Sequence, residues 1–410
     1  MQQDTQVREG KQGETLEIEQ IMQVGARKML KHALEVEIQQ YLADQASAHT
    51  PAGQAAVVRN GYHRARTVLT AYGPVEVQVP RSRSRQAGVP AFISALIPPY
   101  MRKTVALEEA LPLFYLAGLS NGDFLPCFEQ LFGPQTAGVS SASITRLKYA
   151  WSRELDHWRQ RDLHEARYCY LWVDGIYFTL RLAEGRLCVL VVLGARTDGH
   201  KELVAVAGGH RESTESWAAL LRDLQQRGMP TPRLCIGDGH LGFWKAVSEI
   251  YPEAAQQRCW VHKTANILDK LPQSVQPQAK TLIHDMYQAE TEQQARTSFH
   301  AFITRYGEKY PQAVQCLRKD EDTLFTFYQF PAPHWQHIRT TNVIESTFAT
   351  VRLRTQKTRG HGTVEMTLAM VFKLMERAAQ RWRRLRGYKL IRLVVQGATF
   401  KNGKFDHQAA

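Results

Sequence analysis

The spacing of apolar residues divides the chain into segments with different periodicities. Over residues 15–45 the apolar positions recur at helical spacing, which predicts a long helix, whereas residues 1–15 are polar and are predicted to be disordered. Residues 66–85 alternate apolar and polar positions around a Gly-Pro pair, and this alternation predicts a β-hairpin. The exit of that hairpin, residues 81–85, alternates arginine and serine and is expected to be a flexible basic run.

Three amphipathic segments follow and predict short helices joined by polar turns, over residues 105–118, 120–133 and 140–158. Gly118 is suited to end the first of them, and Ser or Asn residues that can cap a helix precede the other two. This arrangement fits a helix-turn-helix, although an ordinary helical bundle produces the same pattern.

Strand patterns begin at residue 167. Three apolar runs are separated by the tight-turn sequences Ala-Glu-Gly and Thr-Asp-Gly, and they cover residues 167–182, 185–196 and 200–210. An amphipathic helix that begins at Ser213 or Thr214, a short strand and another helix come next, over residues 213–228, 232–240 and 241–250. The order βββαβα is an antiparallel meander followed by a crossover to a parallel strand, and it opens a ribonuclease-H-like fold.

The positive charge of the chain is concentrated in two regions. The net charge is +13; residues 346–410 carry 14 Lys/Arg against 3 Asp/Glu, and residues 59–103 carry 8 against 1. Residues 1–50 carry 5 against 8 and are acidic. Separate basic blocks favour a polyanion such as nucleic acid as the partner, with solvated helix faces as the alternative.

Other features bear on the cellular compartment. No apolar run approaches the roughly 18 residues that a membrane-spanning helix needs, and the polar N-terminus lacks a signal-peptide core. The six cysteines are scattered and form no disulfide framework. We therefore expect a cytoplasmic protein that is not bound to a membrane.

One predicted strand contains an acid that needs a partner. Asp174 lies in the apolar stretch 171–182, and an unpaired carboxylate is costly to bury. Asp238 follows at the end of the fourth strand, and Glu345 lies in the first turn of a later helix. Converging carboxylates suit Mg²⁺ or Mn²⁺, and two such ions about 3.5–4 Å apart could serve phosphodiester chemistry. Gly175 would leave room for the close approach of another group.

Each acid also has a purely structural interpretation. Asp174 and Asp238 are both followed by glycine, and Asp-Gly is a frequent turn pair. Asn342 precedes Glu345 by three residues, which fits a capping box that requires no metal. The joint positions of the acids, on the first strand, at the end of the fourth and after a helical interruption, favour the metal site.

Several stretches, in this order and spacing, resemble the bacterial mutator-type insertion-sequence transposases from about residue 59 to residue 386. They are RNGYHR, VPRSRS, LFYLAGLS, VDGIYF, GGHRESTESWAALLRDLQQRG, GDGHLGFWKAV, QQRCWVHKTANIL and TTNVIESTFATVRLRTQKTRG. The resemblance implies a DDE-type transposase and carries the catalytic, metal-holding triad onto Asp174, Asp238 and Glu345. It also implies an all-α insertion between the second and third acids. Such enzymes cut at the element ends with water and join the freed 3′-hydroxyl to DNA without a covalent enzyme intermediate.

The expected fold is therefore a multidomain protein of the α+β or α/β class. A ribonuclease-H-like catalytic core with an all-α insertion follows helical and β-hairpin DNA-binding regions. The predicted regions are an N-terminal helical region (1–52), a β-hairpin and basic arm (53–100), a helical, helix-turn-helix-like DNA-binding region (101–165), the first part of the core (166–251), the insertion (252–335), and the second part of the core with basic C-terminal helices (336–410).

The stretch Cys-Trp-Val-His places Cys259 and His262 at metal-ligand spacing. Zinc needs four ligands and no second pair is nearby, so packing or hydrogen bonding is the preferred interpretation. The resemblance places this stretch in a family signature near the active site. Trp260 could stack on an unpaired base or lie in the core, and His240 could contact a phosphate or cap a helix.

Two groups of basic residues are candidates for contact with DNA phosphates. The first follows Glu345 and consists of Arg352, Arg354, Lys357 and Arg359. The second is the arginine-serine run, whose Arg81, Arg83 and Arg85 could enter a minor groove as a flexible arm.

These observations predict a transposase that binds the terminal inverted repeats of an insertion sequence through its N-terminal regions. Its expected partners are double-stranded DNA, both repeats and target, and a second copy of itself, because two element ends must be processed. Two Mg²⁺ or Mn²⁺ ions per active site and association with the bacterial nucleoid are expected. The alternatives are a catalytically inactive DNA-binding regulator, which the presence of all three acids disfavours, and a structure-directed nuclease that cuts without joining.

Overall fold

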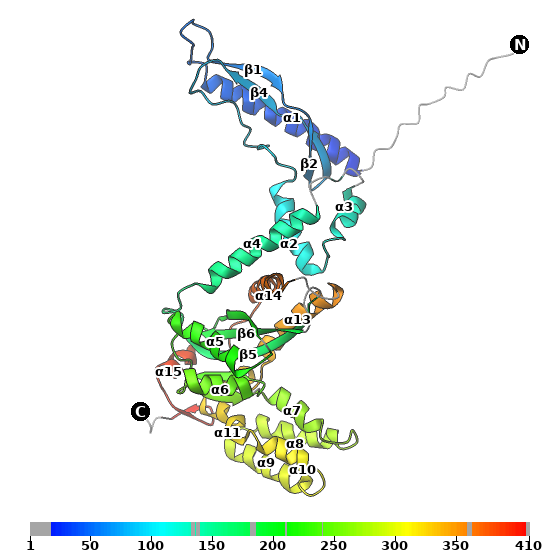
Figure 1. Ribbon diagram of the computed structural model, residues 1–410. Helices are drawn as coiled ribbons and strands as arrows, with labels where there is room; N and C mark the ends of the chain where they lie inside the picture. Colours follow the sequence, from blue (N-terminus) through cyan, green and yellow to red (C-terminus); the bar gives the residue numbers. More distant parts are fainter. Residues whose placement is uncertain are drawn as a thin grey trace, which may run out of the picture. The chain divides into compact units, whose positions relative to one another are not determined.

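The computed structural model describes residues 18–132, 136, 140–180, 186–209, 211–239, 241–358 and 363–406. The chain forms two compact units, residues 1–147 and residues 148–410, and Figure 1 labels the elements of both. The elements of the first unit are α1 (Ile18–Asp44), β1 (Val57–Tyr62), β2 (Arg66–Thr70), β3 (Gly73–Val77), β4 (Pro80–Ser84), α2 (Val105–Ala117), α3 (Phe124–Phe132) and the start of α4 (Ser141–Arg159).

The first unit packs one long helix against a hairpin. Leu34 and Ile38 of α1 are buried against Val68 of β2 and Val75 of β3. Both the long helix and the hairpin predicted from the sequence are confirmed. Gly118, predicted to end a helix, is the residue that follows α2 and has a φ of 126°, which favours glycine.

The arginine-serine run was expected to be flexible, and this expectation is wrong. Its residues form β4, which pairs antiparallel with β1. Successive side chains of a strand point to opposite faces, so Ser82 is buried while Arg81 and Arg83 are exposed. Ser82 Oγ also accepts a hydrogen bond of 2.7 Å from the backbone N–H of Phe92. The arginines are thus displayed by a paired strand.

The second unit is built on a five-stranded sheet with the order β7-β6-β5-β8-β9. Neighbouring strands β5, β6 and β7 are antiparallel, whereas β8 is parallel to both β5 and β9. The strands are β5 (Tyr168–Thr179), β6 (Arg186–Arg196), β7 (Lys201–Gly209), β8 (Leu234–Gly237) and β9 (Ala255–Arg258). With α5 (Thr214–Gln226) and α6 (Leu241–Ile250), this arrangement confirms the predicted βββαβα order.

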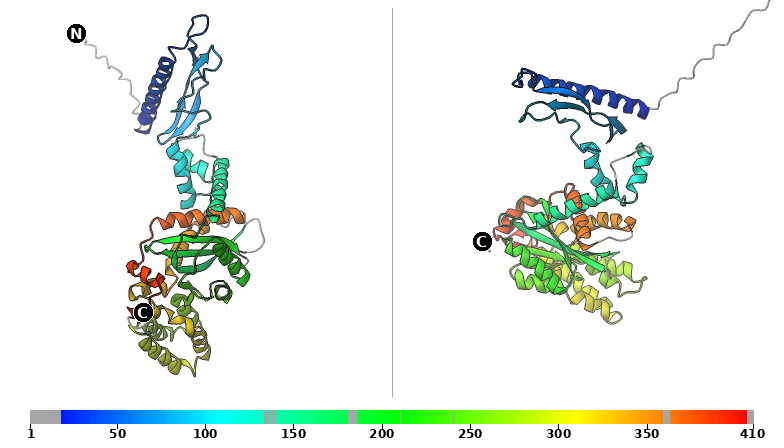
Figure 2. Two further views of the ribbon diagram at one scale, coloured as in Figure 1. Left: turned by 90° about the vertical axis from the view of Figure 1, so that its left-hand side faces the viewer. Right: turned by 45° about the horizontal axis from the view of Figure 1, so that its top comes forward.

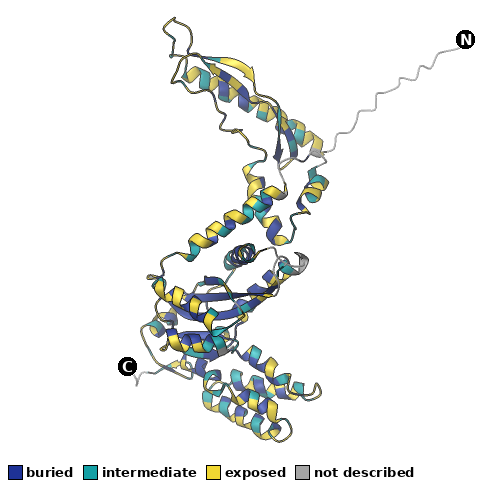
Figure 3. Cartoon of the chain, viewed as in Figure 1, coloured by how far each residue is buried: buried dark blue, intermediate teal, exposed yellow. Residues whose placement is uncertain are grey.

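Helices cover both faces of the sheet, as the two views of Figure 2 show. On one face, Val173 of β5 packs in a single core cluster with Trp217 of α5 and Phe243 of α6. On the other face, the Trp172 indole N–H donates to the His337 carbonyl at 2.8 Å. The second face also carries α13 (Asn342–Thr358) and α14 (Val364–Ala379). The central strands are therefore buried on both sides, and Figure 3 shows them in dark blue.

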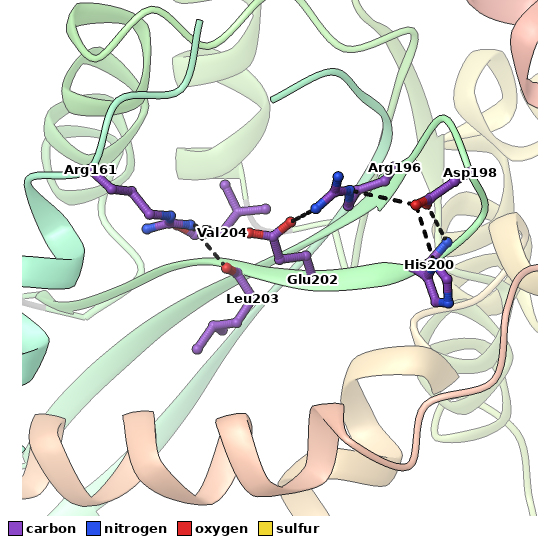
Figure 4. Close-up of polar contacts among 7 residues, drawn as sticks. All are labelled: Arg161, Arg196, Asp198, His200, Glu202, Leu203 and Val204. Atoms are coloured by element: carbon purple, nitrogen blue, oxygen red, sulfur yellow. Dashed lines mark hydrogen bonds and ion pairs between the residues drawn. The ribbon is translucent and has the colours of Figure 1, made fainter. Parts of the chain in front are cut away.

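The exposed edge of β7 is partly covered by side chains. Arg161 donates from Nη2 to the carbonyl oxygens of Leu203 and Val204, both at 3.1 Å (Figure 4). Near the start of β7, Glu202 accepts a hydrogen bond of 3.4 Å from Arg196, the last residue of β6. In the adjoining turn, the Asp198 carboxylate accepts a hydrogen bond from the His200 backbone N–H. Donors that occupy edge carbonyls, together with charged side chains, hinder pairing with another strand.

A helical segment separates β9 from the remaining elements. It consists of α7 (Trp260–Leu268), α8 (Gln276–Gln288), α9 (Glu292–Tyr306), α10 (Pro311–Arg318) and α11 (Glu321–Leu324). Residues 252–335 were predicted to be all-helical, and β9 contradicts this at the start of the range. The sequence of β9, Ala-Gln-Gln-Arg, lacks strand-like alternation, and it extends because β8 offers a free parallel edge.

After this segment the chain returns to the sheet and ends in short elements. They are η1 (Thr326–Gln329), η2 (Ala332–His334), α12 (Trp335–Ile338), α13, α14, η3 (Tyr388–Leu390), α15 (Ile391–Val395), β10 (Phe400–Lys401) and β11 (Lys404–Phe405). Among the residues that the structure describes, no helix combines the length and the apolar character that crossing a membrane would require.

Candidate active site

Asp174 lies in the middle of β5, opposite Val191 of β6. Only 8% of its surface is exposed, and the adjacent Gly175 N–H donates to its Oδ1 at 2.8 Å. Among the described residues, none of the lysines, arginines or histidines forms an ion pair with it. A carboxylate buried in this way is costly unless a cation accompanies it.

Asp238 follows the last residue of β8, beside Asp174. The register pairs Trp172 with Ile236, so the two acids are each two residues beyond a paired position on adjacent parallel strands. The carboxylates of Asp174, Asp238 and a third acid, Glu212, all lie within 4.8 Å of one another. The structure therefore brings two of the three predicted acids together and adds one that the sequence analysis missed.

Burial and mutual repulsion both raise the pKa values of two of these acids. Burial, and then the charge of Asp238, raises the pKa of Asp174 to about 7. The same two causes raise the pKa of Glu212 to about 7. Oxygen donors that repel one another in this way fit a hard divalent cation such as Mg²⁺ or Mn²⁺, whose charge would favour their ionised forms.

Glu345, the third predicted acid, lies in the first turn of α13 but outside this cluster of carboxylates. Its Oε1 accepts a hydrogen bond from the Thr341 hydroxyl at 3.0 Å and lies 3.3 Å from Nε2 of His262. The alternative capping box with Asn342 is not formed, because Asn342 is already the first residue of the helix. Glu345 is thus held by Thr341 and His262.

Cys259 and His262 connect the start of α7 to the start of α13. Cys259 Sγ accepts a hydrogen bond from the backbone N–H of Thr341 at 3.2 Å, and the Thr341 hydroxyl that donates to Glu345 lies 3.2 Å from the same sulfur. Burial alone would lower the pKa of His262, but its hydrogen bond to Cys259 and the charges of Cys259, Asp238 and Glu345 raise it to about 9. Burial would likewise raise the pKa of the Cys259 thiol, and His262 lowers it instead. A cationic imidazole thus lies among the acids.

Trp260 belongs to the core. It is fully buried, and its indole N–H donates to the Leu324 carbonyl at 2.8 Å. The alternative, in which this ring stacks on an unpaired base, does not agree with the structure.

The basic residues after Glu345 differ in their surroundings. Arg352 is exposed on α13, whereas Arg354 is only 2% exposed, so its predicted contact with a phosphate is wrong for this structure. The buried face of α13 includes Val351, one turn before Arg354, which explains the burial. Lys357 lies in the last turn of the helix, and Arg359 and His240 lie outside the described residues. In the first unit, Arg81, Arg83 and Arg85 are all exposed.

Comparisons with solved structures give weak likenesses. The HTLV-2 integrase catalytic core domain in complex with magnesium is 11% identical, with a TM-score of 0.17 over 41% of this chain and 90% of that one. The simian T-cell lymphotropic virus intasome in complex with PP2A regulatory subunit B56 gamma is 12% identical, with a TM-score of 0.18 over 37% of this chain and 47% of that one. Likenesses this weak carry no information about the site.

Comparisons of sequence are far stronger. Residues 1–384 match the family described as "Transposase, Mutator family". The transposase for insertion sequence element IS6120 of Mycolicibacterium smegmatis is 52% identical over 298 residues, which cover 73% of this chain and 92% of that protein. The transposase for insertion sequence element IST2 of Acidithiobacillus ferrooxidans is 44% identical over 274 residues, covering 67% and 93%. The chain therefore belongs to the mutator family of insertion-sequence transposases.

Proposed function

We propose that this chain is an active DDE-type transposase with a ribonuclease-H-like catalytic core. It binds the terminal inverted repeats of its insertion sequence, cleaves DNA at the element ends and joins the 3′-hydroxyl to target DNA. The observation that carries the proposal is the approach of the Asp174 and Asp238 carboxylates on adjacent strands. Glu345 contacts His262, whose charge also interacts with Asp238. The mutator family and its insertion-sequence transposases supply the class of reaction.

The proposed roles follow from where each acid lies. Asp174 and Asp238 would hold a divalent ion between β5 and β8, and Glu345 would contribute from α13. Bound Mg²⁺ or Mn²⁺, with two ions per site, supplies activation of the attacking oxygen and stabilisation of the leaving one. Burial of Asp174 keeps its carboxylate oriented toward the cluster, because the neighbouring strands leave it little conformational freedom.

Glu345 would exchange its contact with His262 for a divalent ion in order to take part. Its carboxylate is hydrogen-bonded to Thr341 and lies 3.3 Å from Nε2 of His262. His262 therefore holds Glu345 near the site while it lies outside the cluster of the other acids. This role fits the raised pKa of His262, whose positive charge offsets part of the charge of the acids.

DNA contact is assigned to the first unit and to α13. The first unit displays Arg81 and Arg83 on β4 and Arg85 directly after it, and α13 displays Arg352 close in sequence to Glu345. Phosphate contacts of this kind make binding steeply dependent on salt. We further propose that a homodimer acts on DNA, because two element ends must be cut and joined.

The test separates chemistry from binding. Asp174→Asn, Asp238→Asn and Glu345→Gln are each compared with wild type for Mg²⁺-dependent cleavage of a duplex that carries the element end, and for binding to the same duplex. We expect cleavage to be lost and binding to be kept. Glu365→Gln, an exposed acid in the first turn of α14, is the control and retains both. Normal cleavage by any of the three variants would remove that residue from the site.

Two further assays address the alternatives. A pre-cut element end tests joining, since a nuclease of the same fold would cleave the intact duplex and leave the pre-cut end unjoined. Removal of residues 1–150 is expected to abolish end-specific binding, and unchanged specificity would refute the assignment of repeat recognition to the N-terminal regions.

A further inference from the structure

Glu212 lies in the loop between β7 and α5 and belongs to no part of the predicted triad. Its carboxylate nevertheless lies within 4.8 Å of both Asp174 and Asp238, whereas Glu345 lies outside that cluster. We infer that Glu212 is a ligand of the divalent ion that Asp174 and Asp238 hold, and that this ion binds before Glu345 leaves His262. The inference rests on the proposed function. It adds one metal ligand, Glu212, and the sequence of events in which the ion binds before Glu345 leaves His262.

Glu212 and Glu345 lie on opposite faces of the sheet. Asp174 is two residues from Trp172 and therefore shares its face, the one that carries α13 and Glu345. Gly175 shares the face of Val173, which packs against α5 and α6. Glu212 reaches the cluster over Gly175, at the start of α5. An ion beside Asp174 can therefore be coordinated by Glu212 from the α5 side without any contribution from Glu345 on α13.

The absence of a side chain at Gly175 is what allows Glu212 to lie there. A Cβ at Gly175 would stand 2.6 Å from both Cδ and Oε1 of Glu212, closer than atoms can approach without displacement. A Cβ at Gly242, in the first turn of α6, would stand 2.4 Å from the Glu212 carbonyl oxygen. Two glycines on separate elements thus leave the space that Glu212 occupies.

The backbone and a neighbouring side chain also direct Glu212 inward. Arg211 has a φ of 60°, a left-handed conformation that residues other than glycine rarely adopt. The Tyr177 side chain of β5, two residues beyond Gly175 on the same face, lies beside Glu212 and lowers the pKa of its carboxyl against the effect of burial. Ser213, the next residue, caps α5 by accepting from Ser216 N–H at 3.2 Å. The loop is therefore fixed on both sides of Glu212.

The surroundings of Asp174 also favour a cation at this cluster. This carboxylate is 8% exposed, points into the cluster, and forms no ion pair among the described residues. Glu212 brings a third carboxylate to two acids that already repel each other, as the raised pKa of Asp174 and of Glu212 indicates. A shared divalent cation explains it, since oxygen ligands from three carboxylates satisfy a hard ion.

The experiment is a titration of the DNA-free, full-length protein with Mn²⁺, in which free Mn²⁺ is measured by electron paramagnetic resonance. The variants are Glu212→Gln and Glu345→Gln, and the control is Glu215→Gln, an exposed acid three residues away in the first turn of α5. We expect E212Q to weaken Mn²⁺ binding by about 10- to 100-fold, the range seen when a group that supports a metal site is lost. E345Q and E215Q should bind as wild type does.

A second variant leaves every acid in place. Gly175→Ala should displace the Glu212 carboxylate and weaken Mn²⁺ binding as E212Q does, with circular dichroism confirming that the protein is folded. Wild-type affinity in E212Q would overturn the inference, and so would equal losses in E212Q and E345Q. The proposed function is judged separately by cleavage in D174N and D238N, so a failure of the inference about Glu212 can be distinguished from a failure of the proposed function.

Discussion

Replacement of Asp174 by Asn should stabilise the metal-free protein while it abolishes cleavage. Asn is nearly isosteric with protonated Asp, and it keeps an oxygen that accepts the hydrogen bond from the Gly175 N–H. What it removes is the cost of ionising a carboxylate that is 8% exposed and adjacent to Asp238. The acid at this position is therefore expected to lower stability in the service of metal binding.

The magnitude follows from the pKa of Asp174, which rises from 3.8 to about 7 in the folded protein. Each unit corresponds to about 1.4 kcal/mol, so the cost in wild type at pH 8 is at most about 4 kcal/mol. Because the folded state holds its proton more tightly than the unfolded state, wild-type stability is greatest below about pH 4 for this group and falls as the pH rises to about 7. The advantage of D174N should therefore be small at pH 5 and largest at pH 8.

The assay is urea unfolding of wild type and D174N in EDTA, followed by circular dichroism between pH 5 and pH 8. The expected result is a free energy of unfolding that falls more steeply with pH in wild type than in D174N. Saturating Mg²⁺ should recover part of the lost stability in wild type and little of it in D174N. Parallel pH profiles for the two proteins would refute the reasoning, because Asp174 would then titrate at its ordinary value.

Two further predictions concern the polar groups around the site. Cys259→Ala leaves the buried N–H of Thr341 without its acceptor, which should cost about 1–3 kcal/mol in urea unfolding. Cys259→Ser should cost less because its hydroxyl can still accept a hydrogen bond, and equal costs for the two variants would contradict the hydrogen-bonding role. Asp320→Asn leaves buried Lys263 and Arg258 without the carboxylate that they contact at 2.7 and 3.1 Å. The free energy of unfolding should therefore fall by about 3–5 kcal/mol. The control, Asp322→Asn at an exposed position, should leave it almost unchanged. Similar unfolding midpoints for the two aspartate variants would contradict this role.

The sequence predicted the elements whose causes are local. The βββαβα order followed from strand alternation and tight turns. A helix start at Ser213 or Thr214 was expected from their position before an amphipathic segment, and the structure has Ser213 as the cap. Asp174 and Asp238 were selected because a carboxylate in an apolar strand and one at a strand end stand out from their surroundings. Their approach is confirmed by the parallel register of β5 and β8.

The features that were missed depend on partners far away in the sequence. Strand β4 exists because it pairs with β1, about twenty residues earlier, and β9 exists because β8 has a free edge. Glu212 could be recognised only from space left by Gly175 and from the backbone of Arg211, neither of which produces a periodic pattern. Burial of Arg354 depends on how α13 is rotated about its axis, which charge alone does not reveal.

The central claim is that Asp174, Asp238 and Glu345 hold divalent ions at the point of DNA cleavage. It is tested most directly by crystals of the protein bound to an element end in Mn²⁺, with the ions located by their anomalous scattering. We predict two peaks about 3.5–4 Å apart at the cleaved phosphate, one between Asp174 and Asp238 and the other in contact with Glu345 released from His262. Bound DNA with no ion between Asp174 and Asp238, or with Glu345 still paired to His262, would contradict the account.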